Sequence, residues 1–434
     1  MNEQDMEQEQ AQESAPRTLL DADITQLSEE ELLTKMIEED WDPEESEDRP
    51  VIPEQLVLPF LAPPSVPYHP RDHDRAIREA SLAPGTSWKE RAGLLSYLAT
   101  NNIEVSFGSP DVPLDLAAAR REIKKLGEST VIVGRLFLLL WNIRHKNMSR
   151  RKGSSVPVLI SEVLRLMGHT KHTKARQQGS ALQYTDGYRP EQKRSVIQDA
   201  ALLSAFQVRA RIMEGGEMTP LNILGPYLKC SLVSKEIGGV HRIVGFYVEP
   251  GDWIKAYETL PEHPADAALA RIDAAICQLD TQNDKYAIRI ALSLTEQWRD
   301  QVAAYQAAQL RGEPLSIDFG IPQKMSELLA SSMIAVPREH VRDRFIPRIE
   351  RALRILVAPE PNPHKPEPEQ RSIIGEASPL VEVDRQQERW DQAWLDASWR
   401  ILPPQDLLNA CTIIEAERPL LPSKKTRGRR KQAR

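Results

Sequence analysis

The sequence has few cysteines and no long uncharged apolar run, and each shortage excludes a class of protein. The three cysteines, Cys230, Cys277 and Cys411, lie far apart, so they fit neither a disulfide framework nor a metal site. The longest apolar run, residues 131–141, contains Arg135 and is too short to cross a bilayer. The acidic N-terminus differs from a signal peptide. These features predict a cytoplasmic protein without a membrane segment.

Signatures of common enzyme classes are also lacking. No Gly-rich phosphate loop ending in Lys occurs, so ATP use is not expected. His169 and His172 come nearest to a metal site, but no third ligand lies beside them in the sequence. We therefore predict a binding protein that is not an enzyme and uses neither cofactor nor metal. The alternative from another class is a metal-dependent nuclease or relaxase built around His169, His172 and Tyr188.

Charge is distributed unevenly along the 434 residues. Residues 1–50 contain 18 acidic and 3 basic side chains, whereas residues 142–211 contain 14 basic and 4 acidic ones. The last twelve residues contain seven basic side chains and no acidic one. The overall net charge of -7 therefore hides a basic central region, which favours a polyanion such as DNA as the partner.

Composition and periodicity divide the chain into four parts. Residues 1–84 combine the acidic segment with a Pro-rich linker and are expected to be disordered, as is the basic tail 419–434. Two domains are predicted between these tails, at residues 85–262 and 266–418. The expected fold class is α+β, mainly α with small antiparallel β-hairpins.

The first domain is predicted to contain three helices followed by a β-hairpin, with a further helix at 253–260 that closes the domain. Apolar spacing indicates helices near 88–98 and 114–126, a core helix at 131–141, a short helix around 159–166, and helices from Pro190 and at 253–260. A long polar loop is expected before Tyr188. Strands from Leu228 and from Val240 flank Gly238-Gly239, a two-residue hairpin turn. This order is typical of a winged helix, a helix-turn-helix variant that binds DNA.

A similar order recurs in the second domain. Apolar faces predict helices from 268, at 286–298 and at 322–330, then a basic helix at 338–356. Pro347 must kink or restart that basic helix. An extended segment at 372–383 and a Trp-rich helix over Trp390, Trp394 and Trp399 follow. The Pro-rich stretch 359–368 is interpreted as replacing a short wing.

Several stretches resemble the tandem winged-helix replication initiators of bacterial plasmids, over roughly residues 130–405. They are residues 164–168, 187–194, 285–290, 296–299 and 342–345, with Trp390, Trp394, Pro403 and Pro404 near the end. The resemblance implies two winged-helix domains in tandem. It also implies binding to repeated sites in double-stranded origin DNA, local duplex opening and recruitment of a host initiator or helicase. A winged-helix transcriptional regulator is the alternative.

Candidate DNA contacts follow from charge and position. At the start of the helix from Pro190, Arg189, Gln192 and Lys193 are predicted to contact base edges, and Arg194 a phosphate. The other candidates come from a basic loop, the hairpin and the basic helix of the second domain: Arg150, Arg151, Lys152, Lys235, Arg242, Arg344, Arg348 and Arg351. The hairpin is alternatively a homodimer contact.

The linker contains one further motif. Gln55, Leu56, Leu58 and Phe60 resemble the pattern by which bacterial proteins bind the sliding clamp. A disordered segment can extend into a clamp groove, with the last two of these side chains in an apolar pocket. Docking of the same side chains on the protein's own first domain is the alternative.

Overall fold

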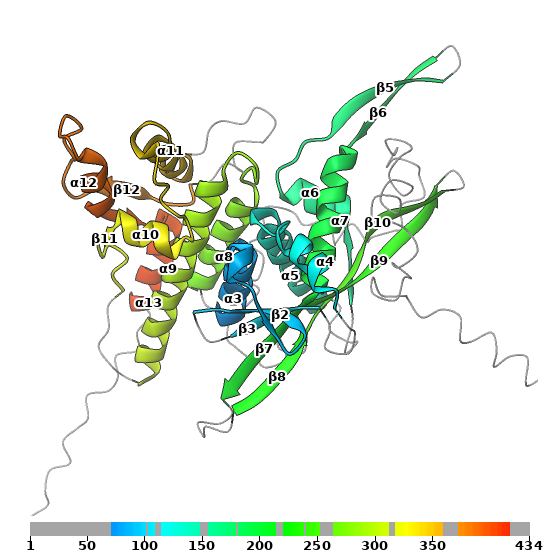
Figure 1. Cartoon of the computed structure of the whole chain (residues 1–434), viewed down its shortest axis with the longest axis horizontal. Helices are drawn as coiled ribbons and strands as arrows, with labels where there is room; N and C mark the ends of the chain where they lie inside the picture. The colour runs from blue at the N-terminus through cyan, green and yellow to red at the C-terminus, as the bar shows by residue number, and fades with distance from the viewer. Residues whose placement is uncertain are drawn as a thin grey trace, which may run out of the picture.

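The computed structural model describes residues 71–100, 103–108, 114–147, 155–178, 181–213, 220–237, 240–251, 264–311, 317–358 and 372–416. Over these ranges the chain combines α-helices with small antiparallel sheets, so the predicted α+β class is confirmed (Figure 1). No helix in these ranges is both long and apolar enough to cross a membrane. Residues 55–60, 150–152 and 253–260, which carry predicted features, lie outside the described residues.

Part of the predicted N-terminal linker is helical. Helix α3 (Arg71–Leu82) lies between Pro70 and Pro84 and contains no proline itself. Its apolar side chains Ala76, Ile77 and Ala80 are buried. The prediction of disorder is wrong for this segment, because a stretch classified by its overall proline content includes a proline-free amphipathic helix.

The first half contains a five-stranded antiparallel sheet in place of the helix predicted at 88–98. Its strand order is β1-β2-β3-β7-β8. The strands are β1 (Lys89–Arg91), β2 (Leu94–Leu98), β3 (Glu104–Phe107), β7 (Phe206–Met213) and β8 (Pro220–Pro226). Ala92 and Gly93 adopt φ values of 49° and 78°, which form the tight turn between β1 and β2. Trp88 is buried and stacks on Phe206 with 6.0 Å between ring centroids.

Several of the remaining elements of the first half, α6, α7, β4 and β10, contact helix α5. The helices are α4 (Leu116–Ile123), α5 (Glu128–Asn147), α6 (Ile160–Leu166) and α7 (Pro190–Ser204). A three-stranded sheet of order β4-β10-β9 contains β4 (Val156–Leu159), β9 (Leu228–Ile237) and β10 (Val240–Pro250). The predicted helices at 114–126, 131–141, 159–166 and from Pro190 are thus confirmed, as is the hairpin. The predicted polar loop before Tyr188 is wrong, since β5 (His172–Gln178) and β6 (Ala181–Gly187) form a hairpin there.

The second half repeats much of this order. Its helices are α8 (Pro264–Cys277), α9 (Lys285–Arg311), α10 (Met325–Ser331), α11 (Ile346–Val357), α12 (Trp390–Asp396) and α13 (Gln405–Ala416). A sheet of order β11-β13-β12 contains β11 (Gln323–Lys324), β12 (Glu376–Pro379) and β13 (Ser398–Leu402). A π-helical turn, Val341–Phe345, precedes α11, so the predicted restart at Pro347 is confirmed.

Two details of the second half differ from the sequence prediction. Trp399 lies in β13 and not in the Trp-rich helix, which ends at Asp396. Its ring meets that of Trp394 edge-on, so the two tryptophans pack together across the helix–strand junction. The Pro-rich stretch 359–368 precedes β12, whereas α12 lies between β12 and β13. That stretch therefore does not replace the connection between the two hairpin strands.

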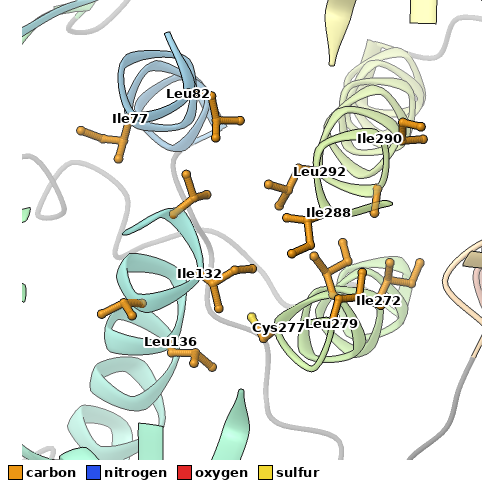
Figure 2. Packing of buried hydrophobic residues seen from close by; sticks show 14 of the residues in the cluster. Ile77, Leu82, Ile132, Leu136, Ile272, Cys277, Leu279, Ile288, Ile290 and Leu292 are labelled. Carbon is orange, nitrogen blue, oxygen red and sulfur yellow. The ribbon is translucent and has the colours of Figure 1, made fainter. Parts of the chain in front are cut away.

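One cluster of buried apolar side chains runs through both halves. Figure 2 shows Ile77 of α3 and Ile132 and Leu136 of α5 on one side, with α8 and α9 facing them. The predicted boundary at 262–266 adjoins residues 252–263, which are outside the described ranges. Helix α9 of the second half contacts both α3 and α5 of the first half, so the two halves pack against each other.

Candidate nucleic-acid interface

Helix α7 is held against α5 by its apolar face. Val196, Ala200 and Leu203 are buried, as their spacing predicts. At the contact, a Cβ added to Gly134 of α5 would lie 3.2 Å from the Leu203 side chain. The glycine therefore permits a close helix approach that fixes the position of α7.

A buried carboxylate adds a polar anchor between the same helices. Asp199 accepts hydrogen bonds from Ser129 (Oγ to Oδ2, 2.5 Å) and Thr130 (Oγ1 to Oδ1, 2.7 Å) at the start of α5. Burial raises the pKa of Asp199 to about 6, although the hydroxyl hydrogen bonds oppose that rise. Asp199 thus orients α7 through contacts that only a carboxylate or an amide of this size can make.

The predicted base-reading residues gather at the N-terminal end of α7. Arg189 is the N-cap residue and is exposed, whereas Gln192, Lys193 and Arg194 are half-buried. The Gln192 side chain accepts a 2.9 Å hydrogen bond from the Arg189 backbone N–H, and its Nε2 lies 3.2 Å from Nδ1 of His169. Gln192 therefore caps the helix, and the exposed cation at this end is Arg189.

The end of the β9–β10 hairpin extends beyond β4, the third strand of its sheet. β4 pairs only with residues 245–248 of β10, so the pairs from Ser234↔Ile243 to Ile237↔Val240 lie past its edge. Where β10 pairs with β4, a Cβ atom on residue 245 would lie 2.4 Å from the Val158 carbonyl oxygen. This position therefore requires glycine. The backbone register sets Lys235 directly opposite Arg242. The two basic positions therefore share one face of the hairpin.

Several basic residues of the second half are exposed, and some of them lie beside a carboxylate. Arg342 donates hydrogen bonds to Asp391 from Nε (3.0 Å) and Nη2 (2.8 Å). Arg351 is exposed but lies 3.8 Å from Asp284. Arg344 and Arg348 are exposed on the turn before α11 and on α11 itself. Of the three arginines predicted to share a DNA-contacting face, these two fit that role best.

No protein-family model matches the chain, and neither a curated protein nor a solved structure gives a significant match.

Some basic side chains that contribute to the positive sequence count are structural. Arg144 is buried and forms two 2.7 Å hydrogen bonds from Nη2 to the Glu162 carboxylate, which ties α5 to α6. Sequence counting cannot separate such an arginine from an exposed one. Lys174 and Arg176 were not among the candidates predicted from the sequence, because they lie in a segment that was predicted to be a loop. Their alternating positions were the only sign that this segment forms strand β5.

Groups with metal-binding capacity are few in the part of the chain that the structure describes. No cluster of three or more His, Cys, Asp or Glu side chains with suitable placement is found there. His169, one of the two histidines considered for a metal site, instead faces the Gln192 carboxamide. Cys230 and Cys277 are buried, and burial raises the pKa of each thiol to about 12.

Proposed function

We propose that this protein is a plasmid replication initiator that binds repeated sites in origin DNA through two winged-helix units. One observation carries the proposal. When β5–β6, β7–β8 and α12 are set aside as insertions, the order helix, strand, helix, helix, strand, strand occurs as α5-β4-α6-α7-β9-β10 and again as α9-β11-α10-α11-β12-β13. In both cases the first strand pairs with the last, giving the orders β4-β10-β9 and β11-β13-β12. Such recurrence fits two copies of one DNA-binding unit.

The proposal assigns equivalent roles to α7 and α11. Each is the third helix of its unit, the position at which helix-turn-helix proteins contact bases in the major groove. Arg189 at α7, and Arg344 and Arg348 at α11, supply exposed positive charge near the N-terminal ends of these helices. Two units on one rigidly packed chain would engage neighbouring stretches of one duplex. The host partners we propose are the sliding clamp and a host initiator or helicase.

Plasmid maintenance tests the proposal. The gene with its flanking DNA is cloned next to a selectable marker on a circle that lacks any other origin. Transformants should replicate the circle with the wild-type gene and lose it with Arg189→Ala/Lys193→Ala. Arg385→Ala is the matched control, since its guanidinium already pairs with Glu350 in the second half.

Two results would contradict the proposal in different ways. Failure of the wild-type circle to replicate, together with specific binding of the purified protein to the flanking DNA, would favour a transcriptional regulator. Absence of salt-dependent binding to duplex DNA would reject a nucleic-acid function altogether.

A further inference from the structure

The connection between α6 and α7 is a long hairpin where a helix-turn-helix unit has a short turn. β5 and β6 pair from His172↔Gly187 to Gln178↔Ala181 and form a sheet of their own. Figure 1 shows this hairpin leaving the N-terminal end of α7 and running away from the helices. An isolated two-stranded ribbon is marginally stable in water, so a surface that binds it would stabilise it.

Strand register places the basic positions of the hairpin on one face and its acidic position on the other. Residues directly opposed in an antiparallel pair share a face, and so does every second residue along a strand. One face therefore receives the positions of His172, Lys174 and Arg176 from β5 and of Gln183 and Thr185 from β6. The acidic residue Asp186 is opposite Thr173 and belongs to the other face. The cationic positions thus share a face that contains no carboxylate residue.

The position of this face matches the proposed path of DNA. We propose that the β5–β6 face carrying Lys174 and Arg176 binds the phosphate backbone of duplex DNA beside the site of α7. The inference rests on the proposed function, because it requires α7 to lie on a duplex. The hairpin joins α7 two residues before Arg189, so a duplex contacted by Arg189 passes the base of the hairpin.

Phosphates fit the hairpin better than base edges do. The major groove, about 12 Å wide, admits a two-stranded ribbon, but α7 would fill that groove at this point. Contacts with phosphates add affinity and salt dependence without adding base preference. Seven residues of strand span about 20 Å, which corresponds to about six base pairs of duplex.

The first test measures affinity as a function of salt concentration. The full chain is titrated with a duplex that the wild-type protein has selected from a random pool, with ten flanking base pairs on each side. Lys174→Ala/Arg176→Ala should lower the slope of log affinity against log salt by about 2, or about 0.9 for each lost phosphate contact. The base preference should not change. Thr173→Ala/Gln177→Ala, on the other face of the same strand, is the matched control and should retain the wild-type slope.

The second test removes the hairpin. Since His172 and Gly187 are directly opposed, residues 173–186 can be replaced by Asn-Gly, which closes a two-residue turn. The footprint on the selected duplex should then shorten by about six base pairs on one side, the length of duplex that the strands can span. Thermal unfolding monitors whether the shortened chain keeps its fold.

The outcomes separate the inference from the proposed function. If the wild-type chain shows no salt-dependent binding to duplex DNA, the proposed function fails and the inference fails with it. If the wild-type chain binds but the Lys174→Ala/Arg176→Ala variant keeps its slope and its footprint, only the hairpin inference is overturned. A variant that changes self-association while the slope stays constant overturns it as well, in favour of a dimer contact.

Discussion

Arg135 on α5 and Asp273 on α8 form a hydrogen-bonded ion pair with 3.0 Å between Nη1 and Oδ1, and it joins the two halves of the chain. The other terminal nitrogen of Arg135 lies 2.5 Å from Asp74 of α3 and 3.9 Å from Glu296 of α9. Arg135, Asp74 and Glu296 are buried. Around them, Arg78 lies 2.8 Å from Glu296, and the network continues to Arg299. Four helices are therefore fixed relative to one another by charge as well as by apolar packing.

Removing Arg135 should destabilise the whole chain. Arg135→Ala leaves Asp74 and Asp273 with less compensating charge in a buried site, so the free energy of unfolding should fall by about 3–5 kcal/mol. Urea unfolding followed by tryptophan fluorescence measures the change. The exposed pair of Arg385 with Glu350 offers a control, since Arg385→Ala should cost less than about 1 kcal/mol. Equal losses in the two variants would contradict a structural role for the network.

Asp199 should make stability depend on pH in a defined direction. Burial raises its pKa from 3.8 to about 6, so the folded chain retains a proton there that the unfolded chain loses. Its contribution therefore falls as pH rises from about 4 to about 6, by on the order of 3 kcal/mol. The Asp199→Asn variant should lack this pH-dependent contribution to the free energy of unfolding.

The unfolding free energy of the variant must be compared with that of the wild type, because His73 changes stability with pH in the opposite direction to Asp199. Burial lowers the pKa of His73 to about 4, so that residue favours the folded state increasingly as pH rises through the same range. Unfolding free energies of both proteins at several pH values give the difference directly. The difference should favour the variant more at pH 6 than at pH 4, and a constant difference would contradict the prediction.

Arg189 is expected to read a base. Arg189→Ala should weaken binding by about 1–3 kcal/mol and relax specificity at one base position, because Arg can contact guanine with two hydrogen bonds. Selection of sites from a random DNA pool measures the specificity. Arg209→Ala on β7 removes the same charge from an exposed residue elsewhere and should leave the selected sequence unaltered. An unaltered sequence with Arg189→Ala would remove this helix end from the base contacts.

Arg344 and Arg348 are expected to contact phosphates. Their double alanine variant should lower the salt slope by about 1.8, which is about 0.9 for each contact. Arg342→Ala in the same turn is the control, since its guanidinium is already bonded to Asp391. Although all three arginines are exposed, Arg342, which is bonded to Asp391, should therefore contribute less to DNA binding than Arg344 or Arg348.

The sequence predicted local helices well and distant strand pairing poorly. The buried apolar face of α7 follows from a 3.6-residue period, and the burial of α5 on nearly all sides follows from its continuous apolar run. By contrast, Leu94, Leu95 and Leu98 have a spacing compatible with a helix, yet Ala92 and Gly93 turn the chain into a hairpin. Trp88, just before this hairpin, packs on Phe206, which lies more than a hundred residues later. No local pattern contains this contact.

The candidate site shows the same limit. The cluster of basic residues at the start of α7 was visible in the sequence, but the use of Gln192 as a cap was not. That role depends on Arg189 lying at the helix N-cap and on His169 lying within reach. Whether a basic side chain faces solvent or a carboxylate, as with Arg342 and Asp391, is decided by residues about fifty positions apart.

The linker motif predicts a contact with the replication machinery that does not depend on DNA. A peptide of residues 50–65 should bind purified sliding clamp weakly and reversibly, because ordering a short segment costs little and the apolar area that it buries is small. A peptide with Gln55→Ala, Leu58→Ala and Phe60→Ala should lose binding, since two apolar anchors and the amide are removed together. Leu56→Ala alone serves as an intermediate case, expected to weaken binding without abolishing it. Equal binding by the first two peptides would contradict the assignment. If neither of these two peptides binds the clamp, the result would favour the alternative, in which these side chains dock on the protein's own first domain.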